Sequence, residues 1–230
     1  MSEGDSCDIT AKNSCCCSNP NPEKETTDLK AHWDKAYTNN PHEKLGWFET
    51  DLSPTFKLLN ISKIAKNARI INIGAGSTVL IDELLKLNYT QLIATDISAV
   101  ALDILEKRVG NEHVSFITDD LTNPTVLKDM DAVDMWIDRA VLHFFTEEKD
   151  QQTYFDLLRS KVSKGGFVLL AEFALDGAKK CSGLDVCRYD TAMLSKKLGK
   201  DFELQDSFEY TYTMPSGDLR PYIYTLFQKI

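Results

Sequence analysis

The sequence predicts an α/β fold: a doubly wound, mixed sheet of seven strands that ends in an antiparallel hairpin. Between residues 69 and 173, short apolar runs rich in β-branched residues alternate with helical patterns of about ten residues, which is typical of βαβ units and a parallel sheet. Two longer strand patterns follow at 202–213 and 220–229, joined by a turn sequence at 214–218. The length of 230 residues suits one domain of this kind.

The individual elements follow from local signals. Leu29, Trp33 and Tyr37 stand four apart, which indicates a helix, and Ser53-Pro54 is a helix start. Lys164-Gly165-Gly166 is expected to stop a long helix. We expect helices at 28–38, 52–60, 78–87, 99–109, 147–162 and 190–199. We expect strands at 69–73, 92–95, 114–117, 133–137, 167–173, 202–213 and 220–229.

Residues 1–27 are polar and carry almost no apolar periodicity, so we expect a disordered tail followed by a single folded domain at 28–230. The chain has six cysteines: Cys7, Cys15, Cys16, Cys17, Cys181 and Cys187. Their spacing does not match a structural zinc site, and we predict no metal site. Soft-metal binding or acylation at residues 15–17 is the alternative to a tail without site chemistry.

Charge and hydropathy restrict the partners. The formal net charge of −9 disfavours nucleic acid, because an acidic surface repels phosphate backbones. No run of about 18 apolar residues is present, so we expect no membrane span. The first residues also lack the basic and apolar stretches of a secretory signal. A cytoplasmic location with reduced thiols is therefore expected.

The strongest functional signal is the turn Gly74-Ala75-Gly76, which lies between a strand and a helix. Glycines there let the backbone approach a ligand, and the free N–H groups of the next helix point toward it. Asp96 ends the second strand about 20 residues later, where an acidic side chain accepts hydrogen bonds from ribose hydroxyls. Val79 occupies the third glycine position of the dinucleotide fingerprint, which argues against NAD. The alternative is a tight turn without a ligand.

From His32 to its end, the chain resembles class I S-adenosylmethionine-dependent methyltransferases, which have a Rossmann-like sheet. It is most similar to small members that open with a Trp-x-x-x-Tyr pattern, including protein-lysine methyltransferases that modify an elongation factor. The matching stretches are His32-Trp33-x-x-x-Tyr37, Leu45-Gly46-Trp47-Phe48, Ile71-Asn72-Ile73-Gly74-Ala75-Gly76-Ser77, Ala94-Thr95-Asp96-Ile97-Ser98 and Trp136-Ile137-Asp138-Arg139-Ala140-Val141-Leu142-His143.

This resemblance implies a cofactor, S-adenosylmethionine, and residues that bind it. Gly74, Ala75 and Gly76 would let the backbone approach its methionine and ribose parts. Asp96 would hold the ribose hydroxyls. Asp120 would accept from the adenine amino group, with Asp119 as the alternative if the register slips by one. The other implied contacts are Ile97 and Leu121 at the adenine ring and Asp138 near the methionine end.

Two further parts of the implied site leave alternatives. Trp33, Tyr37 and Trp47 would form a lid over the cofactor, although ordinary core packing explains the same stripe. Asn72 stands where the family usually has an acidic residue. Its amide oxygen could still position the amino group of the cofactor, but without charge.

Methyl transfer is an in-line displacement, so the protein mainly aligns the reacting atoms. Asp138, Arg139 and His143 are the catalytic candidates on the segment that faces the methyl group in this fold. His143 is either a general base or a structural histidine. Arg139 either clamps a carboxylate of the acceptor or forms a salt bridge. The segment is not Asn-Pro-Pro-Tyr, which makes planar amides and base amines less favoured acceptors.

The predicted function is methyl transfer to a small molecule or to a protein side chain, with lysine as one option. A small-molecule enzyme should have a closed pocket under the lid aromatics. A lysine enzyme should have an open, acidic groove. The alternative from another class is a non-catalytic scaffold with a methyltransferase fold, which an intact cofactor loop argues against.

Overall fold

A computed structural model describes residues 28–230, and the expectations for the tail lie outside these residues. A seven-stranded sheet has the order β3-β2-β1-β4-β5-β9-β8. Its strands are β1 (Arg69–Ile73), β2 (Gln91–Asp96), β3 (Val114–Thr118), β4 (Val133–Arg139), β5 (Val162–Phe173), β8 (Phe202–Thr213) and β9 (Leu219–Lys229). Within it, β9 runs antiparallel to both of its neighbours, β5 and β8, and the remaining pairs are parallel. The predicted mixed sheet with a C-terminal hairpin is confirmed.

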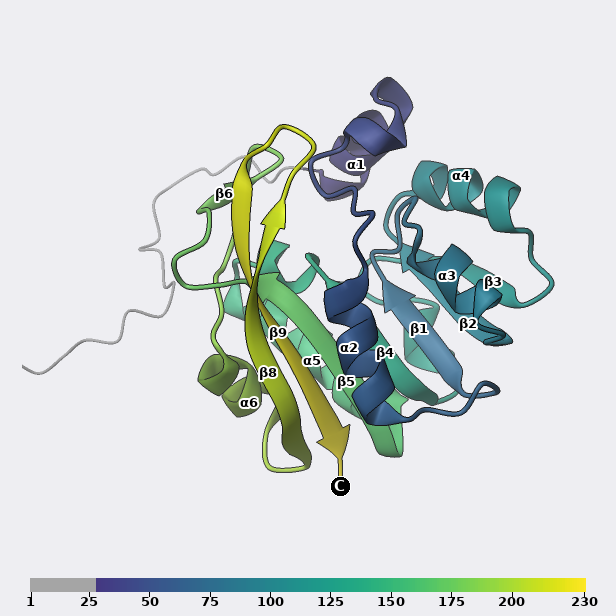
Figure 1. Cartoon of the computed structure of the whole chain (residues 1–230), viewed down its shortest axis with the longest axis vertical. Helices are drawn as coiled ribbons and strands as arrows, with labels where there is room; N and C mark the ends of the chain where they lie inside the picture. The colour runs from purple at the N-terminus through teal and green to yellow at the C-terminus, as the bar shows by residue number, and fades with distance from the viewer. Residues whose placement is uncertain (1–27) are drawn as a thin grey trace, which may run out of the picture.

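Helices cover both faces of this sheet (Figure 1). They are α1 (Leu29–Asn39), α2 (Ser53–Ser62), α3 (Leu80–Lys86), α4 (Ala99–Val109), α5 (Glu148–Lys161) and α6 (Thr191–Leu198), with the short 3-10 turns η1 (His42–Lys44), η2 (Leu127–Asp129) and η3 (Leu142–Phe144). Alternate residues of each strand enter two cores. Ile70 and Ile137 pack with α2, α3 and α4, whereas Ile71 and Trp136 pack with α5 and α6. Because both faces are covered, the central strands are almost continuously apolar.

The predicted helix stop at Lys164-Gly165-Gly166 is wrong, because these residues lie inside β5. The helix α5 ends earlier, at Lys161, and the chain turns directly into extended backbone at Val162. The register between β4 and β5 shifts here, and Gly165 has a φ of +80°. A Cβ on Gly166 would lie 2.9 Å from the carbonyl oxygen of Asp134. The glycines therefore serve an irregular strand pairing rather than a helix end.

Sequence patterns also missed a two-stranded sheet that β6 (Lys180–Cys181) and β7 (Leu184–Asp185) form. At the opposite end of the chain, α1 lies above the carboxyl ends of the parallel strands (Figure 1). Its start is capped by Asp28, which accepts a hydrogen bond from the backbone N–H of Ala31 at 3.0 Å. In the part of the chain that the structure describes, no helix is long and apolar enough to cross a bilayer.

A buried polar chain links α5 to the end of β4. Trp136 donates from its indole nitrogen to the hydroxyl of Tyr154 at 3.1 Å, and that hydroxyl donates to Asp138 at 2.6 Å. All three side chains are fully buried. The Tyr154 hydroxyl thus satisfies a donor and an acceptor that water cannot reach.

We expect Tyr154→Phe to destabilise the protein by about 1–3 kcal/mol, since it leaves the Trp136 donor unpaired and removes the shorter of the two hydrogen bonds to Oδ2 of Asp138. Urea unfolding monitored by circular dichroism measures the loss. Tyr89→Phe is the matched control, because Tyr89 is also a buried residue and no hydrogen bond joins its hydroxyl to another residue in the range 28–230. Equal unfolding midpoints for the two variants would contradict the role of the polar chain.

Candidate functional site

A pocket lies at the carboxyl ends of β1, β2 and β4, beneath α1 and the segment 45–49. Most of the sequence-predicted site residues line it: Trp33, Tyr37, Trp47, Asn72, Gly74, Ala75, Asp96, Ile97, Asp120, Leu121 and Arg139. Gly76, Asp138 and His143 do not line it. The pocket therefore gathers side chains that are far apart in sequence, as ligand sites at the edge of such sheets do.

The two glycines of the turn after β1 are required by geometry. Gly74 and Gly76 have φ values of +55° and +51°, which favour glycine. A Cβ on Gly74 would lie 2.1 Å from a methyl carbon of Val141, and one on Gly76 would lie 2.2 Å from the hydroxyl of Tyr37. The turn is therefore packed tightly between β4 and α1, and larger residues would displace both.

Asp96 ties this turn to the second strand. Its Oδ2 accepts from the backbone N–H of Gly76 and its Oδ1 from that of Ser98, both at 2.8 Å. Each carboxylate oxygen keeps a further lone pair for a ligand hydroxyl. Burial raises the pKa of Asp96 to about 6, although the backbone N–H groups of Ser98 and Gly76 oppose this shift.

Asp119 and Asp120 have different surroundings, and these favour Asp120 as the ligand-facing residue. Asp119 accepts from the backbone N–H groups of Thr125, Val126 and Leu127 at 2.8–3.0 Å, so it holds its own loop. The carboxylate of Asp120 accepts two hydrogen bonds, from the backbone N–H and the hydroxyl of Thr122, and both go to the same oxygen, Oδ1. The second oxygen of Asp120 can therefore accept from a ligand.

The three predicted lid aromatics pack against one another and onto the glycine turn. The indole nitrogen of Trp47 donates to the Tyr37 hydroxyl at 3.1 Å, and the rings of Trp33 and Trp47 lie edge to face at 5.2 Å. Trp33 also contacts Phe144 of η3 in the same way at 5.0 Å. The stripe is both a packed cluster and one wall of the pocket, so the two interpretations of it are compatible.

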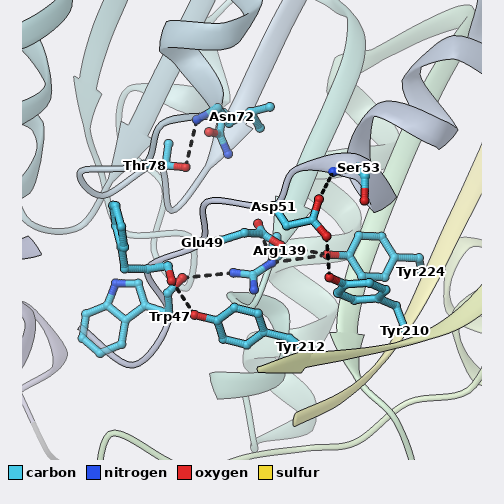
Figure 2. A network of polar contacts seen from close by, with 12 residues as sticks. Trp47, Glu49, Asp51, Ser53, Asn72, Thr78, Arg139, Tyr210, Tyr212 and Tyr224 are labelled. Atoms are coloured by element: carbon cyan, nitrogen blue, oxygen red, sulfur yellow. Dashed lines mark hydrogen bonds and ion pairs between the residues drawn. The ribbon is translucent and has the colours of Figure 1, made fainter. Parts of the chain in front are cut away.

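Arg139 is a hub beside this cluster (Figure 2). Its Nε lies 3.0 Å from Glu49 and donates to the Tyr224 hydroxyl at 3.3 Å, while Nη1 donates to the carbonyl oxygen of Trp47 at 3.2 Å. Its guanidinium carbon lies 4.9 Å from the centre of the Tyr212 ring, and the Tyr212 hydroxyl donates to the carbonyl oxygen of Phe48. These contacts fix the segment 47–49 against β4 and the C-terminal hairpin.

Asp138 does not line the pocket, contrary to the expectation from sequence, and His143 fits the structural one of its two alternatives. Both side chains have no exposed surface. The His143 ring is stacked on Phe173 at 4.5 Å, and its Nδ1 lies 2.9 Å from Glu172. Burial lowers the pKa of His143 to about 3 and raises that of Glu172 to about 8. A neutral, enclosed imidazole cannot take a proton from a ligand in this pocket.

Sequence reasoning missed Glu49 and Phe144, which line the pocket together with Cys181. Glu49 follows the segment Leu45–Phe48 directly, and a single acid after such an apolar stretch is a signal that could have identified it. Phe144 follows His143, and nothing in the residue type distinguished it from core. Cys181 lies in the small sheet that the patterns did not predict.

Comparison with known proteins identifies the domain. Residues 70–166 match a family model described as "Methyltransferase domain". Residues 70–166 of the chain are therefore similar to a methyltransferase domain. The chain is 23% identical over 157 residues to EEF1A lysine methyltransferase 2 of Danio rerio. That match covers 61% of this chain and 66% of the relative, slightly less than two thirds of its length.

Solved structures show the same fold at low identity. A SAM-dependent methyltransferase from Anabaena variabilis has a TM-score of 0.71 at 15% identity, over 88% of this chain and 93% of that one. The N-methyltransferase NodS of Bradyrhizobium japonicum, in complex with S-adenosylhomocysteine, has a TM-score of 0.65 at 12% identity, over 87% and 97%. A Burkholderia thailandensis 1,6-didemethyltoxoflavin-N1-methyltransferase has a TM-score of 0.63 at 18% identity, over 92% of this chain and 93% of that one.

Because two of these neighbours hold S-adenosylhomocysteine and the central residues match a methyltransferase domain, S-adenosylmethionine is the expected cofactor. The side-chain oxygen of Asn72 indicates whether the pocket residues suit S-adenosylmethionine. Asn72 replaces the usual acid, and its Oδ1 is buried with no hydrogen-bond partner among residues 28–230, while its Nδ2 donates to the carbonyl oxygen of Ile73 at 3.3 Å. An acceptor left unpaired in a pocket costs free energy, which an ammonium donor would recover. We expect Asn72 to accept from the amino group and Asp96 from the ribose.

The affinity for S-adenosylhomocysteine should fall about tenfold between pH 7 and pH 5, because ribose hydroxyls donate to ionised Asp96, whose pKa is about 6. Isothermal titration calorimetry measures it directly. Melting temperatures would not isolate this change in affinity. Because the pKa of Asp96 is raised in the folded protein, the ligand-free protein itself loses stability as the pH rises from 3.8 to about 6. Asp96→Asn should bind more weakly with a flat profile, and a flat wild-type profile would exclude the mechanism.

The side chain of Asp34 links α1 to the start of α4, where the Ser98 hydroxyl donates to it at 2.7 Å. Asp34→Ala should weaken S-adenosylhomocysteine binding about threefold to tenfold, because Tyr37 is then held less firmly over Gly76. Asp103→Ala is the charge-matched control, since Asp103 pairs with Lys107 on the exposed side of α4. If both variants bind alike, α1 does not act as a lid.

Proposed function

We propose that this protein is an active enzyme that transfers the methyl group of S-adenosylmethionine to a small-molecule acceptor. The single observation that carries the proposal is the aromatic lining of one part of the pocket. This part, the acceptor chamber, is lined by Trp33, Trp47, Phe144, Arg139 and Cys181. It adjoins the glycine turn, so an acceptor in the chamber would lie next to the methionine end of the cofactor.

The charges of the chamber favour a small molecule over lysine. Its carboxylate, Glu49, is already paired with Arg139 at 3.0 Å. Among the described lining residues, the other carboxylates, Asp96, Asp119 and Asp120, lie on the loops beside the glycine turn. A lysine side chain would therefore meet a guanidinium without an unpaired acid to balance its charge. Lysine remains the second candidate because of the Danio rerio relative.

The chemistry needs little from the protein beyond alignment. The cofactor supplies an activated methyl group on a sulfonium. A lone pair of the acceptor forms the new bond to the methyl carbon, the carbon–sulfur bond breaks, and its electron pair remains on sulfur. A proton carried by the acceptor leaves to water. The chamber holds the acceptor in line and excludes bulk solvent, which supplies most of the rate effect.

Cofactor binding is the first test. S-adenosylmethionine or S-adenosylhomocysteine at 100 times its dissociation constant should stabilise the protein by about 2.7 kcal/mol, which raises the melting temperature by roughly 5–10 °C. NAD should leave it unchanged, and Asp96→Ala should abolish the shift. The absence of a shift with both sulfur compounds would favour the scaffold alternative.

Acceptor class is tested by measuring S-adenosylhomocysteine formation with small thiols, amines and phenols, and in parallel with a lysine-rich peptide. We expect turnover with a small molecule and none with the peptide. Phe144→Ala opens the chamber and should lower that turnover while cofactor binding is kept. Turnover with the peptide alone would replace the proposal with lysine methylation.

A further inference from the structure

The guanidinium of Arg139 has one unused nitrogen. Its Nε and Nη1 are engaged by Glu49, Tyr224 and the carbonyl oxygen of Trp47, whereas Nη2 is buried with no hydrogen-bond partner among residues 28–230. In Figure 2, this nitrogen points away from Asn72 and toward the side of Tyr212. An ionic donor that is fixed in position and left unpaired is poised for an anionic ligand.

A second pocket adjoins the acceptor chamber on that side. It shares Leu45, Trp47 and Cys181 with the first pocket, and Tyr222 belongs to its wall. The Tyr222 ring lies 5.0 Å from the guanidinium carbon of Arg139. The second pocket is therefore adjacent to the acceptor chamber at Arg139.

Cations surround this second pocket. Lys44, Lys180 and Arg220 line it, and its described lining residues include no aspartate or glutamate. Lys180 also contacts Asp185 at 3.4 Å, in an exposed pair. The chain as a whole carries a formal charge of −9, so a basic entrance is a local departure from its composition. Such an arrangement raises the local concentration of anions at the pocket.

We propose that the methyl acceptor is a carboxylate-bearing small molecule, which enters past Lys44 and Arg220 and binds through its carboxylate to Nη2 of Arg139. This inference rests on the proposed function and names its substrate class. A carboxylate fits better than a phosphate dianion, because only one guanidinium nitrogen is free and Glu49 lies beside it. The aromatic walls of the chamber would hold the rest of the acceptor.

The test uses protein saturated with S-adenosylhomocysteine and two matched pairs of probes: benzoate with benzamide, and phenylacetate with phenylacetamide. Calorimetry should show each carboxylate binding at least about tenfold more tightly than its amide, since a hydrogen bond to a charged group is strong. Equal affinities, or no binding by any probe, would overturn the inference.

Variants of the Arg139–Glu49 ion pair should change the affinity for carboxylates in opposite directions. Glu49→Gln removes the competing negative charge and should tighten carboxylate binding, whereas a purely structural pair predicts no gain. The double variant Glu49→Gln/Arg139→Gln keeps the pair neutral and should erase the preference for carboxylate over amide. If Glu49→Gln leaves carboxylate affinity unchanged or weaker, Arg139 is not the anion site.

The entrance is tested separately, with variants outside the buried network. Lys44→Gln and Arg220→Gln should each slow benzoate association about twofold to threefold at low salt, followed by stopped-flow fluorescence of Trp33 and Trp47. Lys164→Gln removes the same charge from the exposed start of β5, at the opposite end of this strand from Phe173 of the second pocket, and should have no effect. Equal rates in all three variants would exclude this entrance.

The outcomes separate the two proposals. If S-adenosylhomocysteine binds and turnover occurs with neutral acceptors only, the methyltransferase proposal stands and the anion site is wrong. If S-adenosylhomocysteine fails to bind, the proposed function fails. In that case, the affinities of benzoate and benzamide for the ligand-free protein are compared, and a preference for benzoate supports the anion site independently of the proposed function.

Discussion

The pocket depends on the buried ion pair between Arg139 and Glu49. Arg139 ends β4, Glu49 precedes α2, and Tyr224 on β9 donates to Glu49 at 3.5 Å, so three distant parts of the chain meet at one guanidinium. Burial raises the pKa of Glu49, and Arg139 opposes the shift. A buried pair adds little net stability over apolar packing, but loss of one partner leaves an uncompensated charge. The pair therefore fixes where the segment 47–49 lies over the pocket.

Hydrogen-bond satisfaction separates the polar groups that build the fold from those that await a ligand. The carboxylates of Asp119 and Asp138 receive donors from their own loop or from Tyr154, which leaves little capacity for a ligand. By contrast, Asn72 Oδ1 and Arg139 Nη2 are buried and unpaired among residues 28–230. Both atoms belong to residues that line the pocket, so we expect a ligand to supply their partners, whereas the unpaired ring nitrogens of His143 lie in the core. Residue type alone does not make this distinction.

The sequence predicted the sheet well because burial on both faces gives each central strand a continuous apolar run. It misplaced Asp138 and left the role of His143 open, because the direction of a side chain is not encoded in residue type. Successive residues of β4 face opposite sides: Arg139 shares its side with Ile137 and α2, whereas Asp138 shares its side with Trp136 and α5. This alternation was readable from the sequence. Which of the two sides carries the pocket was not, since packing of α1 and α2 decides it.

The two halves of the pocket also differ in how far similarity to other methyltransferases can describe them. The family match spans residues 70–166 and includes Gly74, Asp96 and Asp120. The acceptor chamber takes Trp47 and Cys181 from segments before and after that match. Because these segments pack onto the domain through long-range contacts, their position depends on pairs such as Arg139 and Glu49 rather than on local pattern. Similarity in the matched region therefore indicates the cofactor, while the acceptor is selected by the residues that surround it.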